Sequence, residues 1–313
     1  MITSPLGFAI VAPAGYPPDQ RTVERGIAGL EARGCLVHNY YDHHAIHQRF
    51  GGTDEARLAQ LYAAADDPDV HVVMAVRGGY GLTRLLPHID FERLAASGKL
   101  FVGYSDITAL QMGLMAKTGA LSYAGPFLAT DFGAAEPVDF TLDNFWQCLG
   151  GPTHMIVETV CGNPCVDVAG TIWGGNLAML ASLVGTEHFP RIEGGSLDGG
   201  ILFVEDIAEH PYRVERMILQ LLQAGVLDRQ QALVLGDFSG YRLGPMDNGY
   251  CFDAMVDYLR AALPIPVLTG LSFGHIARRV TIPFGAQARL ASNGEGFTLG
   301  LSDYPTLRIR PAA

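Results

Sequence analysis

The chain contains the stretch Lys99-Leu-Phe-Val-Gly-Tyr-Ser-Asp-Ile-Thr-Ala-Leu-Gln-Met-Gly-Leu-Met115. Its apolar start predicts a short strand that ends at the turn Gly103-Tyr104-Ser105. From Asp106 onward, apolar residues recur at helical spacing until Gly119 ends the pattern. The stretch therefore predicts a strand, a tight turn and a helix, with Ser105 on the turn.

A serine at this position lies at the C-terminal end of a strand and at the N-terminus of a helix. The free backbone N–H groups and the helix dipole at that place favour developing negative charge, which is where a serine nucleophile is expected. Serine at a helix N-terminus also commonly serves only as a cap. The stretch alone leaves both interpretations of Ser105 open.

The first half of the chain alternates between strand and helix patterns. Apolar runs predict strands at 8–12, 35–38, 69–76 and 121–125, and helical patterns cover 19–33 and the segment that begins at Thr53. Such alternation is typical of a parallel sheet covered by helices on both faces, with functional loops at the strand C-termini. We therefore predict an N-terminal α/β domain over residues 1–147.

The second half has a different pattern. Glycine and proline accumulate between residues 148 and 165, which predicts a linker. Helical patterns near 176–183 and 210–224 are then interleaved with short strand patterns at 166–172, 201–204, 232–235, 280–283, 288–291, 297–301 and 307–309. We therefore predict a β-rich, barrel-like α+β domain over residues 166–313.

Length and composition exclude several classes of protein. The 313 residues suit two domains, and 49% hydrophobic with 17% charged residues is typical of a globular protein. A net charge of −11 disfavours nucleic-acid and anionic-membrane partners. The N-terminus resembles no signal peptide, and no run reaches the roughly 20 apolar residues of a membrane helix. We therefore expect a cytoplasmic protein.

The five cysteines are scattered along the chain, and none belongs to a metal-binding pattern. Cys161 and Cys165 are four residues apart, but no second Cys or His pair follows at zinc-site spacing. Free thiols in a reducing compartment are the favoured interpretation. The cluster of His43, His44 and His47 has no evident carboxylate or cysteine partner, so no metal site is predicted.

A glycine-rich loop, Gly78-Gly79-Tyr80-Gly81, follows the strand predicted at 69–76. It lacks the spacing and the acidic residue of a dinucleotide fingerprint, which disfavours a phosphate cradle. Acyl transfer requires two N–H donors aimed at one oxygen, and the amide after Ser105 supplies only one. The loop is therefore the better candidate for the second donor of an oxyanion hole.

A serine nucleophile requires a base that is itself oriented by an acid. Among ten histidines, His275 is the best candidate because it follows an apolar run on the glycine-containing loop Gly270-Leu-Ser-Phe-Gly274. Glu205 and Asp206 end another apolar run, where an isolated charge is costly. The pattern does not choose between these two acids, and either of them paired with Arg213 or Arg216 is an alternative.

These motifs together resemble the LD-carboxypeptidase family, serine peptidases also called muramoyltetrapeptide carboxypeptidases. The matching segments follow in family order: Phe50-Gly-Gly-Thr-Asp54, Ala75-Val-Arg-Gly-Gly-Tyr-Gly81, Gly103-Tyr-Ser-Asp-Ile-Thr108, Gly170-Thr-Ile-Trp-Gly-Gly-Asn-Leu177, Val204-Glu-Asp206, Glu209-His-Pro-Tyr-Arg-Val-Glu-Arg216 and Gly270-Leu-Ser-Phe-Gly-His275. They span nearly the whole chain, which makes chance agreement improbable.

The resemblance implies a Ser-Glu-His triad that falls on Ser105, Glu205 and His275, and it favours Glu205 over Asp206. It also implies that the site forms where the two domains meet, and that the protein is a homodimer. No metal and no organic cofactor is required. We expect the backbone N–H groups of Asp106 and of Gly78 or Gly79 to form the oxyanion hole.

The implied substrate is a murein tetrapeptide, either free or linked to a muramoyl or UDP group, from which terminal D-alanine is released. Arg77 is the candidate for the terminal carboxylate, and Trp173 is a candidate pocket residue that could equally be packed in the core. One alternative is a peptidase of aminoacyl-nucleotide antibiotics that confers self-immunity. It would require an aromatic platform for the nucleobase, and the chain has only two tryptophans, Trp146 and Trp173. Another alternative is a non-catalytic nucleotide- or peptide-binding module.

Overall fold

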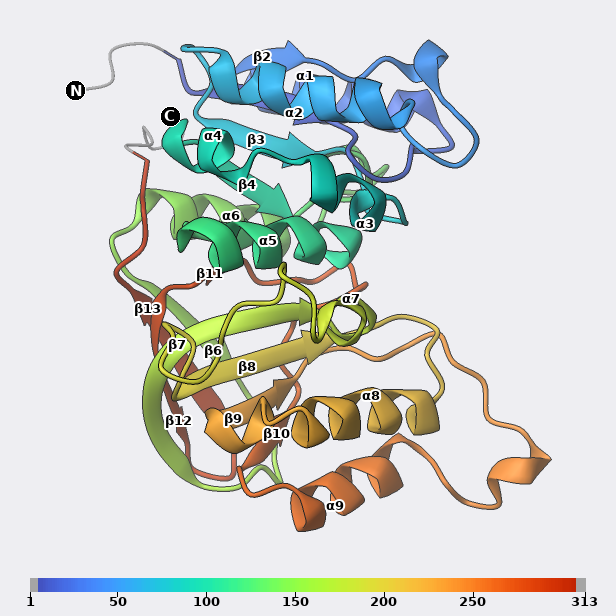
Figure 1. The fold of residues 1–313 in the computed structure, drawn as a ribbon, viewed down its shortest axis with the longest axis vertical. Coiled ribbons are helices and arrows are strands. Elements are labelled where there is room, and N and C mark those ends of the chain that lie inside the picture. Colours follow the sequence, from blue (N-terminus) through green and yellow to red (C-terminus); the bar gives the residue numbers. More distant parts are fainter. Residues whose placement is uncertain (1–4, 308–313) are drawn as a thin grey trace.

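Two β-sheets organise the chain, and Figure 1 shows the first sheet above the second. The structure is a computed structural model that describes residues 5–307. The first sheet has the strand order β11-β5-β4-β3-β1-β2. Its strands are β1 (Gly7–Val11), β2 (Leu36–Asn39), β3 (Val72–Ala75), β4 (Leu100–Gly103), β5 (Ser122–Ala124) and β11 (Ile282–Phe284). All neighbours are parallel except β11 and β5.

Helices cover both faces of the first sheet, as the alternating pattern predicts. They are α1 (Gln20–Ala32), α2 (Asp54–Asp66), α3 (Leu82–Leu85), α4 (Phe91–Ala96), α5 (Thr108–Thr118) and α6 (Asp139–Gly150). The helices α2, α4 and α5 pack side by side, whereas α1 and α6 both contact the π-helical turn Leu128–Phe132. Since both faces are covered, β1, β3 and β4 are buried along their whole length.

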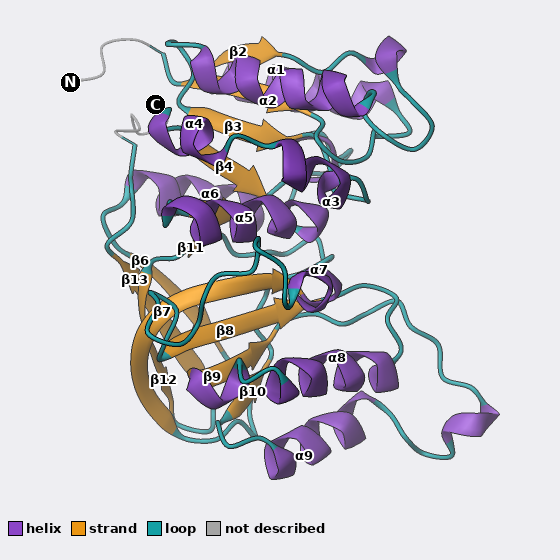
Figure 2. Cartoon of the chain, in the orientation of Figure 1, coloured by secondary structure: helices purple, strands orange, loops and turns teal. Residues whose placement is uncertain are grey.

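The second sheet is mixed and β-rich, which confirms the predicted fold class. Its order is β10-β9-β8-β7-β12-β13-β6. The strands are β6 (His154–Glu158), β7 (Val166–Asn176), β8 (Gly200–Glu205), β9 (Gln230–Leu235), β10 (Val267–Thr269), β12 (Gln287–Ser292) and β13 (Phe297–Ser302). The strands from β7 to β10 are parallel, and those from β7 to β6 are antiparallel. Figure 2 shows α8 (Pro211–Gln223) and α9 (Phe252–Ala262) beside the parallel strands, with α7 (Leu177–Leu183) at their end.

Side chains join the two edge strands of this sheet, β6 and β10. At the end of β6, Glu158 accepts hydrogen bonds from the Ser272 backbone N–H (2.8 Å) and hydroxyl (3.0 Å). A few residues later, Asn163 Oδ1 accepts from the Thr269 N–H (2.8 Å), and Asn163 Nδ2 donates to the Thr269 carbonyl (3.0 Å). These contacts bring the ends of β6 and β10 close together, as in a barrel-like unit, although no backbone ladder joins the two strands in the described residues.

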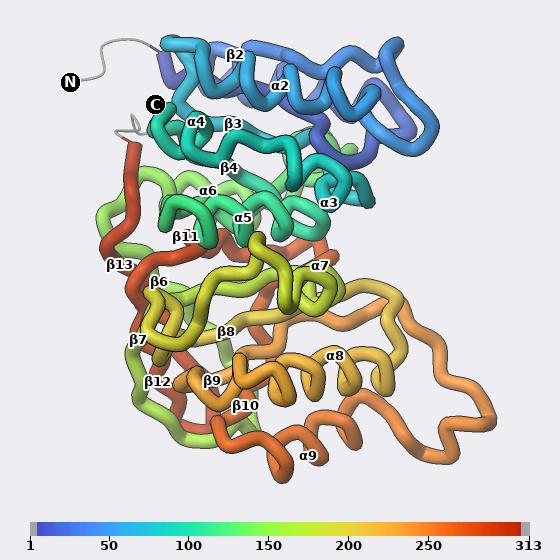
Figure 3. Tube along the Cα trace, viewed as in Figure 1, coloured from blue at the N-terminus to red at the C-terminus, as the bar shows by residue number. Residues whose placement is uncertain are grey.

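The structure corrects three details of the sequence-based prediction. The segment 148–165 is not a simple linker, because α6 continues to Gly150 and β6 occupies five of its residues. The strand predicted at 280–283 is β11, which pairs with β5 of the first sheet and not with strands of the second sheet. Figure 3 shows this segment of the C-terminal half lying against the N-terminal half. The helix α9 was not predicted. The strand expected at 307–309 lies mostly outside the described residues.

We predict that the Glu158 contact stabilises the fold. Glu158→Ala leaves the Ser272 N–H without its acceptor, and the expected loss is about 1–3 kcal/mol of the free energy of unfolding. Urea denaturation measures this loss as a lower midpoint at an unchanged slope. Glu136→Ala, at an exposed residue, is the matched control and should leave the midpoint in place. An equal midpoint for both variants would contradict the prediction.

Candidate active site

The turn after β4 presents Ser105 as the strand-turn-helix pattern predicts. Ser105 begins a 3₁₀ turn, Ser105–Ile107, that continues into α5. Its backbone has a φ of 57°, in the left-handed region that residues other than glycine seldom adopt and that is often associated with function. No side chain caps the 3₁₀ turn or α5. The capping interpretation of Ser105 is therefore wrong.

Three residues that are distant in sequence form one chain of hydrogen bonds. His275 Nδ1 lies 2.7 Å from Glu205 Oε2, and His275 Nε2 lies 3.0 Å from Ser105 Oγ. A carboxylate only accepts, so Nδ1 carries the imidazole proton and leaves Nε2 to accept from the serine hydroxyl. The structure thus brings the three predicted triad residues together in the arrangement that activates a serine.

The structure also distinguishes between the two neighbouring acids. Successive residues at the end of a strand point to opposite sides, so Glu205 faces His275 and Asp206 does not. Glu205 has no exposed surface, and a charge buried so completely requires a partner such as the imidazole. Neither arginine of the alternative pairs with Glu205 or Asp206: Arg213 pairs with Glu209 at 2.8 Å, and Arg216 lies 5.7 Å from the centroid of the Tyr212 ring.

Asp206 instead holds the start of α7. Its carboxylate accepts from the Ala178 N–H (2.9 Å), from Asn176 Nδ2 (3.0 Å) and from the Ile207 N–H (2.9 Å). Burial raises the pKa of Asp206 to about 6, and the nearby charge of Glu205 also raises it, while these hydrogen bonds oppose the shift. Asp206 is therefore a structural acid beside the candidate triad.

The glycine loop after β3 passes directly over the serine. A Cβ atom on Gly78 would lie 2.8 Å from Ser105 Cβ and 2.9 Å from its Oγ, so only glycine fits. Gly79 has a φ of 114°, which likewise favours glycine. Within residues 5–307, the Gly78 and Gly79 N–H groups donate no hydrogen bond to the protein. The Asp106 N–H lies in the first turn of the helical segment, where amides lack an intrahelical acceptor.

Two buried charged side chains hold this loop, and sequence analysis did not assign either of them that role. Arg57, which has no exposed surface, donates from Nη1 to the Gly81 carbonyl (3.0 Å) and to the Pro13 carbonyl (2.5 Å). The Asp106 carboxylate accepts from the Leu82 N–H at 2.9 Å. A charged residue on the buried face of a predicted helix was the signal available for Arg57.

The two predicted substrate-binding residues lie in different environments. Arg77 is half-buried beside the glycine loop, donates to the Tyr16 carbonyl (3.1 Å), and makes no ion pair with the described acids. Trp173 is fully buried, and its indole N–H donates to Gln230 Oε1 (2.8 Å). An indole with no exposed face cannot line a pocket, so the core interpretation of Trp173 is correct.

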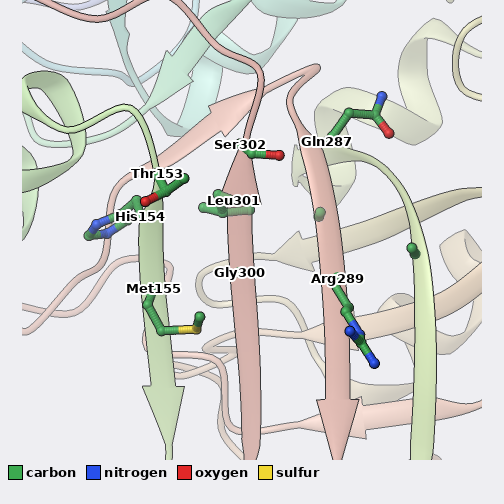
Figure 4. Close-up of a pocket in the computed structure, with 10 residues that line it drawn as sticks. Thr153, His154, Met155, Gln287, Arg289, Gly300, Leu301 and Ser302 are labelled. Carbon is green, nitrogen blue, oxygen red and sulfur yellow. The ribbon is translucent and has the colours of Figure 1, made fainter.

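Other parts of the described chain do not enlarge the site. A groove on the antiparallel half of the second sheet is lined by residues of β6, β7, β12 and β13, and none of them belongs to the triad (Figure 4). Residues 5–307 contain no cluster of three or more His, Cys, Asp or Glu side chains that could hold a metal ion. All five cysteines are unpaired. None of the described helices is long and apolar enough to span a bilayer.

Comparison with known proteins identifies the same two halves. The sequence matches the family profile of the LD-carboxypeptidase N-terminal domain over residues 8–125 and that of the LD-carboxypeptidase C-terminal domain over residues 169–290. The crystal structure of a muramoyltetrapeptide carboxypeptidase from Oxalobacter formigenes superposes with a TM-score of 0.90 at 50% identity, covering 96% of this chain and 100% of that one.

Two curated relatives extend the comparison. The murein tetrapeptide carboxypeptidase of Pseudomonas aeruginosa is 32% identical, over 91% of this chain and 93% of its own. The microcin C7 self-immunity protein of Escherichia coli is 29% identical, over 93% of this chain and 91% of its own. Both similarities extend over nearly the full length of each chain.

We predict a pH-dependent contribution of Asp206 to stability. Its pKa is about 6 in the folded protein and near 3.8 when unperturbed, so the folded state binds this proton more tightly. The stabilisation is fully present below the lower value and is lost as the pH rises through the higher one. Relative to Asp206→Asn, the free energy of unfolding of the unmodified protein should fall by about 1–3 kcal/mol between pH 4 and pH 7. Urea denaturation at several pH values measures this, and a constant difference would contradict it.

Proposed function

Because the chain belongs to the LD-carboxypeptidase family, we propose that it is a serine carboxypeptidase that releases the terminal D-alanine of murein tetrapeptides in peptidoglycan recycling. The observation that carries the proposal is the hydrogen-bonded chain of Ser105, His275 and Glu205. The names of the Oxalobacter and Pseudomonas relatives support the choice of substrate.

The triad geometry supports a two-step mechanism. Ser105 Oγ attacks the carbonyl carbon of the L-configured diamino acid that precedes D-alanine, while His275 Nε2 takes the hydroxyl proton. The C–N bond then breaks, and His275 returns the proton to the departing amine of D-alanine. Water attacks the acyl-enzyme with the same base and releases the tripeptide. Glu205 holds the proton on Nδ1 throughout and stabilises the imidazolium.

The glycine loop supplies the electrostatic part of this mechanism. The tetrahedral oxyanion accepts from the Asp106 N–H and from the N–H of Gly78 or Gly79. The missing side chain at Gly78 supports this assignment, since the loop backbone can then approach the reacting carbon closely. Arg57 and the Asp106 carboxylate keep these donors in position before the substrate arrives.

The terminal carboxylate of D-alanine requires a cation near the leaving-group side. Arg77 fits this role because it directly precedes the loop that carries the proposed oxyanion donors and makes no ion pair within residues 5–307. Its bond to the Tyr16 carbonyl orients the guanidinium and leaves other N–H groups free for a carboxylate.

The self-immunity function of the microcin relative is a weaker candidate. A peptidase of aminoacyl nucleotides would need an aromatic face for the base. Trp173 has no exposed surface, and Trp146 is 9% exposed and packs on Phe8 and Phe145, so neither tryptophan offers one. A binding module without catalysis would have no use for an aligned triad.

The setting of the enzyme is part of the proposal. We place it in the cytoplasm, which the five unpaired thiols support because they suit a reducing compartment. The murein peptide is free or linked to a muramoyl or UDP group. The resemblance to the family supports a homodimer.

We expect D-alanine release to depend on the triad and on the configuration of the substrate. The unmodified protein should release D-alanine from an L,D-linked muramoyl tetrapeptide and should leave the peptide with a terminal L-alanine intact. Ser105→Ala should lower kcat by about 10⁴- to 10⁶-fold while retaining the fold. A coupled assay for free D-alanine measures both.

Two further variants and one competitor sharpen this test. Glu205→Gln should lose far more activity than Asp206→Asn, and the reverse order would contradict the assignment of the acid. An aminoacyl sulfamoyl nucleotide added in competition tests the second candidate. Its cleavage in preference to the tetrapeptide would favour the self-immunity function, and binding without turnover of either substrate would favour a binding module.

We predict that Arg77 recognises the terminal carboxylate. Arg77→Ala should raise KM about 10- to 100-fold, because a charge-assisted hydrogen bond contributes about 1.5–3 kcal/mol. With the unmodified protein, a tetrapeptide that ends in D-alaninamide should show the same rise in KM relative to the peptide with a free carboxylate. With Arg77→Ala, the two peptides should have the same KM. Arg21→Ala, at an exposed ion pair, is the matched control. Undiminished preference for the carboxylate in Arg77→Ala would exclude this role.

A further inference from the structure

The candidate base lies on a segment that has no regular structure of its own. Residues 270–281 connect β10 to β11 and contain neither helix nor strand, yet His275 within them must meet Ser105 from the other half of the chain. Such a segment lacks the ladder or helical hydrogen bonds that fix a backbone, so other contacts must position it. Several side chains do so: Glu158 bonds Ser272, Thr141 bonds the Ala277 carbonyl and the Arg279 N–H, and the side chain of Arg279 holds the residue next to His275.

Arg279 connects the histidine segment to the N-terminal half. Its side chain is 2% exposed, Nη1 donates to the Gly274 carbonyl (2.8 Å), and Nη2 lies 2.5 Å from Asp131 Oδ1. Gly274 immediately precedes His275. Asp131 is itself held, because its Oδ2 accepts from the Phe127 N–H at 2.8 Å. The guanidinium of Arg279 therefore joins the Gly274 carbonyl, next to His275, to the carboxylate of Asp131 in the N-terminal half.

The same guanidinium also contacts the residue before the nucleophile. Arg279 Cζ lies 3.8 Å from the centroid of the Tyr104 ring, which stacks on Phe127 at 4.2 Å and meets the His275 ring edge-on at 5.1 Å. Tyr104 directly precedes Ser105. The guanidinium thus contacts the immediate neighbours of both the base and the nucleophile, without bonding to either.

We propose that Arg279 is a positioning residue that sets the separation between His275 Nε2 and Ser105 Oγ. The inference that this separation serves peptide hydrolysis rests on the proposed function. The role depends on the shape of the group as well as on its charge. A planar fork donates in two directions while its face covers a ring, whereas an ammonium group does neither in a fixed geometry. If Arg279 served only as the positive partner of Asp131, a lysine at this position would be expected to replace it well. If Arg279 positions His275 and Ser105, lysine should replace it poorly.

The test is Arg279→Lys, which retains the charge and loses the fork. We expect kcat for D-alanine release to fall about 10- to 100-fold with KM within about twofold, because misplacing a reacting group by about 1 Å costs that much. A crystal structure of the variant should show the Nε2 to Oγ distance lengthened beyond hydrogen-bond reach. Arg289→Lys, at the exposed pair with Asp167, is the matched control and should change neither quantity.

An Arg279→Lys protein that retains both the kcat and the distance of the unmodified protein would overturn the inference. If this variant does not fold, Asp131→Asn replaces it, because its amide oxygen keeps one acceptor for Arg279 while the charge and the acceptor for the Phe127 N–H are lost. A smaller fall in kcat, about threefold to tenfold, is then expected with the same lengthening, and unchanged values would overturn the inference. The distance tests this inference even if the unmodified protein releases no D-alanine, an outcome that would reject only the proposed function.

Discussion

The buried contact between Glu205 and His275 is the interaction on which the rest of the structure depends. A carboxylate without exposed surface is costly unless it is paired, so the imidazole must stay within hydrogen-bond distance of it. Both residues belong to the second half, whereas Ser105 lies on the turn after β4 of the first half. The two halves must therefore keep a fixed relation, and the pairing of β11 with β5 helps to hold it.

Solvent exposure increases from Glu205 to His275 along the candidate triad. Glu205 is fully buried, the His275 side chain is 18% exposed, and Ser105 lies on a turn beneath a glycine loop. This order suits the proposed acyl transfer, because the carboxylate of Glu205 is kept away from water while His275 and Ser105 remain within reach of a peptide. Gly78 keeps the hydroxyl of Ser105 accessible in the same way, because a Cβ atom there would lie 2.9 Å from Ser105 Oγ.

Helices whose ends depend on local chemistry were predictable from the sequence. The helical patterns expected from Thr53 and from residue 210 are α2 and α8, which Thr53 and His210 cap with their side chains. Strands whose place depends on distant pairing partners were not predictable in this way. The short strand β6 alternates buried and exposed residues within a region rich in glycine and proline, which hid its strand pattern. The strand β11 pairs with β5 of the other half, and the Thr281 N–H just before it bonds Asn144 of that half. Trp173 was ambiguous because burial is a property of the packed structure.

The sequence by itself determined the alternating elements of the first half, the turn that carries Ser105, and the ordered motifs of the family. These depend on periodicity, glycine and capping residues within a few positions of one another. The family resemblance favoured Glu205 over Asp206, but only the tertiary structure shows that the carboxylate of Glu205 faces the histidine while that of Asp206 holds a helix, and that Arg279 joins the segment of His275 to the other half. Such choices follow from contacts between residues far apart in the chain, which no local pattern encodes.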